Sequence, residues 1–301
     1  MTYGSYIIQW SLHFFFVIIK INIVYFATKL QGSDNKLFAQ EAHRMKDYFS
    51  SSVEKAFPCR KRLFVYEETD STNTRARLFA LSDTEKGSAL FIAKRQTAGR
   101  GRRARSFLSE EGGLYLSYLS YPEIPPGEAI MLTLYAAVAV CETVEELTGA
   151  SPRIKWVNDV YLNGKKLSGI LTEGAFADDG KSFLYSVTGI GINLSRMDFP
   201  PELCDIATDL ETETQMRVDV GEFARLLYDK LSKFSKDDKS YLEKYRNRCF
   251  HLGSRITVIT QDGSYTAVAE RILEDGSLAV TDGDGCERIL LSEEVSLKLD
   301  K

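Results

Sequence analysis

Arginine and glycine are concentrated in one short stretch, Gln96–Phe107, whose sequence is QTAGRGRRARSF. Its four arginines carry planar guanidinium groups, which bind phosphate or carboxylate oxygens through paired N–H donors. Gly99 and Gly101 allow backbone conformations that other residues disfavour, so the loop can fold closely over a ligand. The stretch therefore predicts an anion-binding loop. Taken alone, the stretch suits the phosphate or carboxylate of a small molecule on one side, and a solvated basic turn or an RNA contact equally well on the other.

A second stretch, Lys155–Glu173 (KWVNDVYLNGKKLSGILTE), carries charges of both signs on two β-rich runs. Asn163-Gly164 separates the runs and is typical of a tight hairpin turn. The hairpin is expected to bring together five polar residues: Lys155, Asn158, Asp159, Lys165 and Lys166. An aspartate suits Mg²⁺ or an amine, and lysines suit negative charge developing on a phosphate. The alternative is an exposed hairpin with surface ion pairs, which contribute little to stability.

Two shorter polar stretches accompany them. Thr69–Asn73 (TDSTN) follows an expected strand, where its side chains could bind a small polar head group or cap the next helix. Gly189–Asn193 (GIGIN) places two glycines in an expected buried strand that ends in an amide. It is not the GxGxxG pattern, so it predicts no dinucleotide site.

Charge and cysteine usage exclude several function classes. The chain has 301 residues, a net charge of −4 and a pI near 5.6, which argues against a general nucleic-acid binder with a basic face. The five cysteines are scattered singly, as free thiols of a reducing cytoplasm would be. The three histidines are equally isolated. Neither a zinc site nor a catalytic histidine is expected.

The elements that must position these residues follow from hydrophobic periodicity. Strands are expected within Arg62–Asn73, Ser88–Gly99, Gly112–Pro122, Arg153–Phe176 and Ser182–Ser195. Helices are expected over Phe38–Phe57, over Gly127–Gly149, and as one or two helices within Val220–Phe250. After Gly253, short strands separated by Asp-Gly turns predict a small all-β barrel.

The N-terminal segment Tyr6–Ala27 is strongly apolar, yet Lys20 would lie near the centre of a bilayer. The segment lacks the basic region and the cleavage site of a signal peptide. A membrane anchor and a start codon assigned too early, with Met45 as the true start, both stay open.

In their order and spacing, the stretches STN, QTAGRGRR, KWVNDVYLNGKKLSGILTE and GIGIN resemble the biotin–protein ligases. The C-terminal β module resembles that family's SH3-like domain, and the resemblance covers residues 62–299. It implies an α+β fold: a mixed β-sheet with packed helices, then a small SH3-like β-barrel. The implied domains are an N-terminal extension (1–60), a catalytic domain (61–250) and the C-terminal β domain (251–301).

The resemblance also implies a two-step reaction. Biotin and MgATP first give biotinyl-5′-AMP and pyrophosphate. A lysine of a biotin carboxyl carrier domain, as in acetyl-CoA carboxylase, then attacks the activated carbonyl, and AMP leaves. ATP, Mg²⁺ and biotin are thus the expected small-molecule ligands, with no prosthetic group.

Site residues are carried over from the motifs. Biotin is expected to contact Ser71, Thr72, Asn73, Gln96, Arg100, Gly101, Arg102 and Lys166. The nucleotide is expected to contact Arg100, Arg102, Arg103, Phe107, Asn158 and Asn193. Catalytic roles are expected for Arg102, Lys166, Asp159 and Lys155, with Asp159 as the Mg²⁺ contact.

Three positions depart from the family pattern. Ala104 replaces a loop glycine, Phe107 replaces a tryptophan and Val157 replaces a proline. None of these changes removes a charge, so efficiency is put in doubt more than identity.

Residues 1–60 also lack the winged-helix pattern that some members carry, so no DNA binding is expected. A cytoplasmic protein is expected, either a monomer or a homodimer. The alternatives are a lipoate or octanoate ligase on the same fold, a nucleic-acid-binding protein, and an inactive membrane adapter.

Overall fold

The computed structural model describes residues 48–58, 62–103, 105–177, 180, 182–260, 263–291 and 296–299. These residues belong to one compact unit, Asp47–Lys301. The apolar segment 6–27, Met45 and Ala104 lie outside the described residues, so the expectations placed on them stay predictions.

A seven-stranded mixed sheet forms the centre of the molecule, in the order β1-β2-β3-β7-β6-β5-β4. Its strands are β1 (Leu63–Thr69), β2 (Ala89–Gln96), β3 (Gly113–Ser120), β4 (Arg153–Lys155), β5 (Asp159–Leu162), β6 (Lys165–Phe176) and β7 (Phe183–Asn193). Only β1 and β2 pair in parallel, joined by helix α4 (Thr72–Ser82); the other pairs are antiparallel. The expected mixed sheet with packed helices is confirmed.

The two faces of the sheet carry different layers because successive side chains of a strand point to opposite sides. Leu90 and Ile92 of β2 belong to the main hydrophobic core, which the helices on one face share. Phe91, between them, packs in a smaller cluster with Ala76 of α4 on the other face. The second face is only partly covered, and this leaves room for a site.

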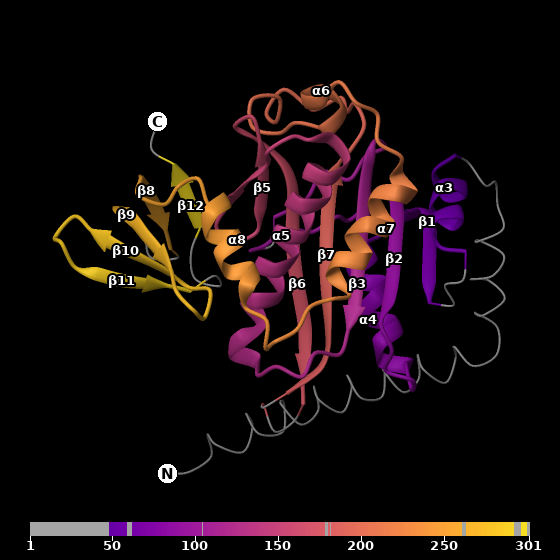
Figure 1. The fold of residues 1–301 in the computed structure, drawn as a ribbon, viewed down its shortest axis with the longest axis horizontal. Coiled ribbons are helices and arrows are strands. Elements are labelled where there is room, and N and C mark those ends of the chain that lie inside the picture. The colour runs from indigo at the N-terminus through magenta and orange to yellow at the C-terminus, as the bar shows by residue number, and fades with distance from the viewer. Residues whose placement is uncertain are drawn as a thin grey trace, which may run out of the picture. The chain divides into compact units, whose positions relative to one another are not determined.

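The main core is covered by helices α5 (Ala129–Thr148) and α7 (Val220–Leu231), which cross the same face of the sheet (Figure 1). Helix α5 ends at Gly149 with φ of 70°, the left-handed conformation that glycine favours at a helix end. By length and composition α5 with the turn before it (Pro126–Thr148) could cross a membrane. However, 12 of the 20 side chains of α5 are buried inside the protein, as in a core helix.

The remaining helices are short: α3 (Tyr48–Ala56), the 3₁₀ turn η1 (Pro126–Glu128), α6 (Leu210–Thr214) and α8 (Ser240–Arg248). Of the expected helix over Phe38–Phe57, only the part within α3 lies in the described region. The segment Val220–Phe250 forms two helices, α7 and α8, separated by a polar stretch. Helix α6 was not predicted from the sequence.

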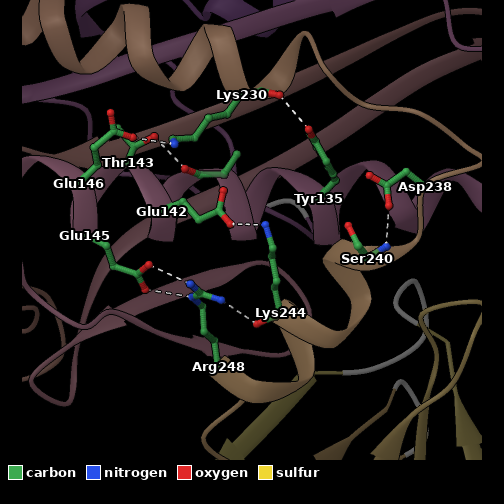
Figure 2. A network of polar contacts seen from close by, with 11 residues as sticks. Tyr135, Glu142, Thr143, Glu145, Glu146, Lys230, Asp238, Ser240, Lys244 and Arg248 are labelled. Atoms are coloured by element: carbon green, nitrogen blue, oxygen red, sulfur yellow. Dashed lines mark hydrogen bonds and ion pairs between the residues drawn. The ribbon is translucent and has the colours of Figure 1, made fainter.

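Ion pairs join the outer side of α5 to α7 and α8 (Figure 2). The Glu145 carboxylate accepts two hydrogen bonds from Arg248, at 3.0 and 2.8 Å. Glu142 pairs with Lys244, and Glu146 with Lys230, each at 2.8 Å. Ion pairs this close to solvent contribute little to the free energy of folding. Their effect is mainly to fix how the helices align.

A second, five-stranded antiparallel sheet follows, in the order β11-β10-β9-β8-β12. Its strands are β8 (Arg255–Ile259), β9 (Ser264–Ile272), β10 (Leu278–Asp282), β11 (Glu287–Leu290) and β12 (Ser296–Leu299). The small C-terminal β module is confirmed, whereas the domain boundary at 250/251 stays a prediction.

The C-terminal sheet is hydrogen-bonded to the rest of the unit. The indole Nε1 of Trp156 donates to the Gly276 carbonyl at 3.0 Å, and Arg246 Nε donates to the Ile272 carbonyl at 3.0 Å. Gly276 has φ of 85°, and a Cβ there would lie 2.5 Å from Leu134 of α5. Only glycine fits both requirements.

His251 lies at this junction, between α8 and β8, and is 0% exposed. Within the described residues, neither ring nitrogen has a hydrogen-bond partner. Burial, together with the positive charge of Lys155, lowers the pKa of His251 from 6.5 to about 4. The folded protein therefore holds this histidine neutral.

We predict that the free energy of unfolding falls as the pH drops from 6.5 towards 4. In that range His251 becomes protonated in the unfolded chain but not in the folded protein. Up to about 3 kcal/mol of the free energy of unfolding that is present above pH 6.5 is therefore lost. Denaturant titrations at a series of pH values should show that the free energy of unfolding depends less steeply on pH in His251→Phe than in the wild type. Equal dependences would contradict the prediction.

Candidate active site

One pocket gathers nearly all the site residues expected from the sequence. It opens on the sheet face that α4 partly covers. The expected residues that line it are Ser71, Thr72, Asn73, Gln96, Arg100, Gly101, Arg102, Arg103, Phe107, Lys155, Asn158, Asp159 and Lys166. They come from three segments far apart in the chain, which the sheet brings together.

Glycines in the sheet make room for this pocket. Gly191 of β7 pairs with Gly169 of β6, and a Cβ on Gly191 would lie 2.5 Å from the Phe107 ring. Gly189, one pleat along β7, lies beneath Asn73, whose side-chain amide would overlap any Cβ there. The GIGIN stretch therefore serves close packing: its glycines let the arginine loop and the start of α4 lie directly on the sheet.

The TDSTN stretch forms the polar end of the pocket, where β1 passes into α4. Ser71 is the N-cap of α4, but its side chain makes no capping hydrogen bond. The backbone N–H of Thr72 donates to Gln96 Oε1 at 2.8 Å. Asn73 Nδ2 donates to the Glu173 carboxylate at 2.8 Å. The stretch thus begins a helix and also lines the pocket, so the two interpretations of this stretch do not compete.

Beneath these residues lies Ser117 of β3, which is 0% exposed. Its Oγ lies 2.7 Å from Thr72 Oγ1 and 2.6 Å from Asn73 Oδ1. No role for Ser117 was predicted from the sequence. The signal was present, however, because Ser117 interrupts the apolar run of GLYLSYLS on the face that carries the site.

The arginine loop folds back on itself as a short hairpin. Gly101 N donates to the Arg105 carbonyl at 2.7 Å, and Phe107 N donates to the Gly99 carbonyl at 2.9 Å. A Cβ on Gly99 would lie 2.5 Å from the Phe107 carbonyl, so glycine is needed at this close approach. The loop is thereby held over the pocket.

Three arginines tie the loop to three different elements. Arg100 pairs with Glu173 of β6 at 2.8 Å. Arg102 donates to Asn158 Oδ1 at 3.1 Å, and Arg103 donates to the Ile259 carbonyl of β8 at 3.3 Å. The loop therefore spans the pocket from β6 to the C-terminal sheet.

The hairpin places Lys166 beside Asp159, with Nζ 2.7 Å from Oδ1. The same ammonium lies 5.8 Å from the centre of the Phe107 ring, within range of a cation–π contact. Burial lowers the pKa of the neighbouring Lys155, and the positive charges of Lys166 and Arg105 lower it further, against the opposing effect of Asp159. The hairpin thus concentrates positive charge, as the sequence had suggested.

Asn193 is placed differently from the other expected residues. It is 5% exposed, its Nδ2 donates to the Thr208 carbonyl at 2.9 Å, and it is not among the residues that line the pocket. Its contact with a nucleotide stays a prediction. Val157 is also buried away from the pocket, where its carbonyl accepts a hydrogen bond from Tyr245 at 2.9 Å.

Charge divides the pocket into two ends. Six basic residues line it (Arg100, Arg102, Arg103, Arg105, Lys155 and Lys166), whereas Asp159 is the one acid among the described lining residues. The TDSTN end lines the pocket with hydroxyl and amide groups, and Glu173, which is paired with Arg100, accepts a hydrogen bond from Asn73 there. Neither histidine nor cysteine occurs among the described lining residues, so the pocket suits orientation and charge stabilisation better than attack by a protein nucleophile.

Comparisons with known proteins agree with this architecture. Residues 65–193 match the model of the biotin/lipoate A/B protein ligase family. The chain is 33% identical over 238 residues to the bifunctional ligase/repressor BirA of Bacillus subtilis, covering 76% of this chain and 72% of the relative. It is 31% identical over 235 residues to a biotin–acetyl-CoA-carboxylase ligase of Paracoccus denitrificans, covering 75% of this chain and 96% of the relative.

Among solved structures, the biotin protein ligase of Aquifex aeolicus in complex with biotin and ATP is 33% identical, with a TM-score of 0.65. The alignment covers 80% of this chain and 100% of the other. Because the relatives are matched over most of their length and the pocket unites the family's motifs, this chain belongs to the biotin/lipoate A/B protein ligase family, among its biotin–protein ligases.

Proposed function

We propose that the protein joins biotin to a lysine of a biotin carboxyl carrier domain, through biotinyl-5′-AMP. The observation that carries this proposal is the division of one pocket into an end lined by hydroxyl and amide groups and an end lined mostly by cations. Biotin has the matching form, with a neutral ureido ring at one end and a carboxylate at the other. The names of the Paracoccus relative and of the Aquifex complex support biotin, ATP and a carboxylase as the ligands and partner.

In the first step, a biotin carboxylate oxygen attacks the α-phosphorus of ATP, and pyrophosphate leaves with the electrons of the broken P–O bond. Negative charge accumulates on the phosphate oxygens. Lys166 and Arg102 supply positive charge there, and Lys155 adds a third cation. The residues Arg100, Arg103, Phe107 and Asn158 are proposed to enclose the nucleotide.

Magnesium enters with ATP as part of the co-substrate. Among the described residues, no group of three or more potential protein ligands is present. Mg²⁺ in nucleotide sites is commonly held by one or two carboxylates plus phosphates, and the single carboxylate Asp159 fits that pattern. When bound, the ion would neutralise phosphate charge, while Asp159 itself holds Lys166 in position.

In the second step, the carrier lysine attacks the acyl carbonyl of the adenylate as a free amine. The C–N bond forms, the amine loses a proton and AMP leaves. Water must be kept from the mixed anhydride until then. The arginine loop, tied down by Arg100, Arg102 and Arg103, is proposed to provide that cover.

The proposal is tested by biotin-dependent exchange of labelled pyrophosphate into ATP. We predict exchange with biotin but not with lipoate, and a loss of at least 100-fold, roughly 3 kcal/mol of transition-state stabilisation, in Lys166→Ala. Lys244→Ala, which removes a surface pair of α8, is the control. Exchange with lipoate alone would move the function to lipoate or octanoate ligation, and exchange with neither acid would contradict the proposal.

Arg102→Ala should release biotinyl-AMP into solution. Removing a hydrogen bond to a charged group costs about 1.5–3 kcal/mol, so we expect roughly a tenfold or greater rise in the free adenylate. Chromatography of the filtrate after reaction without carrier measures it. Arg95→Ala, a surface arginine of β2, should behave like the wild type. Tight retention by Arg102→Ala would exclude a covering role for this loop.

A pH dependence follows from Lys155. Because its pKa is lowered from the ordinary value of 10.5, it loses its charge at lower pH than an ordinary lysine as the pH rises. We predict that kcat/KM for ATP declines on the alkaline side of neutrality and that Lys155→Arg, whose charge persists, shifts this decline to higher pH. Superimposable profiles of the two proteins would exclude Lys155 as the titrating group.

A further inference from the structure

The polar end of the pocket contains four side chains in one hydrogen-bonded chain, and the position of each hydrogen can be deduced. Asn73 Nδ2 lies 2.8 Å from a Glu173 carboxylate oxygen and 3.2 Å from the Leu171 carbonyl. Both neighbours only accept hydrogen bonds, so this atom must be the nitrogen. The amide oxygen of Asn73 therefore faces Ser117.

The next two hydrogens follow from this orientation. Ser117 Oγ lies 2.6 Å from Asn73 Oδ1, an acceptor, so the single hydroxyl hydrogen of Ser117 is directed there. Thr72 Oγ1 lies 2.7 Å from Ser117 Oγ, which has no hydrogen left to give. The Thr72 hydroxyl must therefore donate to Ser117. All three donors point away from the pocket and towards the Glu173 carboxylate.

Gln96 is fixed independently. Its Oε1 accepts the backbone N–H of Thr72 at 2.8 Å, and its Nε2 donates to Ser109 Oγ at 3.0 Å. Ser109 is oriented in turn, because its hydroxyl donates to the Phe107 carbonyl at 3.0 Å. Gln96 Oε1 lies 3.1 Å from Thr72 Oγ1. Once the Thr72 hydrogen is directed to Ser117, two oxygens with unused lone pairs lie side by side at the pocket.

We propose that Ser117 is a positioning residue that makes the polar end of this pocket an acceptor site, selective for ligands whose head group presents N–H donors. This inference rests on the proposed function, since the ureido ring of biotin carries two N–H groups. A dithiolane ring such as that of lipoate carries none. It would leave both acceptors unpaired, and sites built for a hydrogen bond strongly reject ligands that lack it.

The test uses the whole chain and direct binding, measured by calorimetry without ATP. The probes are biotin and the two cyclic carbamates in which one ureido N–H is replaced by oxygen. Of the two carbamates, we expect the one that binds less tightly to bind the wild type about tenfold more weakly than biotin does. The reason is that one hydrogen bond is lost and the new ring oxygen faces an acceptor of the site. In Ser117→Ala, the Thr72 hydroxyl turns to Gln96 Oε1, so biotin binding weakens about tenfold and the preference over the carbamate falls to near one.

Ser186→Ala is the matched control. Ser186 is also fully buried in the central sheet, and its hydroxyl has no hydrogen-bond partner among the described residues. It should keep the preference of the wild type. Should Ser117→Ala fail to fold, Ser117→Cys keeps the shape of the side chain with a larger atom at its end. Since a thiol is a weak donor and acceptor, this variant should lose the preference likewise.

The outcomes separate the two proposals. Biotin binding with an unchanged preference in Ser117→Ala would overturn the role of Ser117 and leave the proposed function intact. Equal weakening of all ligands would do the same, because it would show a purely structural serine. A wild-type protein that does not bind biotin would overturn both.

Discussion

The site depends on one steric constraint: beneath the pocket, three positions of the central sheet carry no side chain. Gly169, Gly189 and Gly191 lie where the arginine loop and the start of α4 meet the sheet. With any larger residue there, Phe107 and Asn73 would be displaced from the sheet, and the loop and helix with them. The arginines can therefore reach their partners across the pocket only because these three Cβ atoms are absent.

On this base, two of the six cations that line the pocket are paired with carboxylates before any ligand binds. Arg100 pairs with Glu173, and Lys166 with Asp159. These partly buried pairs hold the cations in place, so little reorganisation is needed when an anion arrives. Their two carboxylates must also be displaced or accommodated by that anion. The pocket therefore favours a ligand whose negative charge attracts these cations more strongly than the two carboxylates do.

Much of this arrangement could be predicted from the sequence, because it is local. Alternation of apolar and polar residues predicted the strands, and Asn163-Gly164 predicted the hairpin turn. All but one of the site residues expected from the four motifs line the pocket. What could not be predicted depends on register. Ser117 lies opposite Gly189 only because β3 pairs with β7 as it does, and the Asn193 amide turns to Thr208, a partner from a loop with no periodic signal. The hydrogen bond between Trp156 and Gly276 likewise joins residues 120 positions apart.

That last hydrogen bond attaches the C-terminal sheet to the segment that carries several of the pocket residues. Trp156 follows Lys155 and precedes the hairpin residues Asn158 and Asp159, and it is buried at 4% exposure under the turn that contains Gly276. It is one of two tryptophans in the chain; the other, Trp10, lies outside the described residues. With Trp10 replaced by Phe, the Trp156 indole becomes an optical probe: a red shift of its emission would reveal detachment of the C-terminal sheet. Transplanting that sheet from another protein would require a glycine carbonyl at the same place.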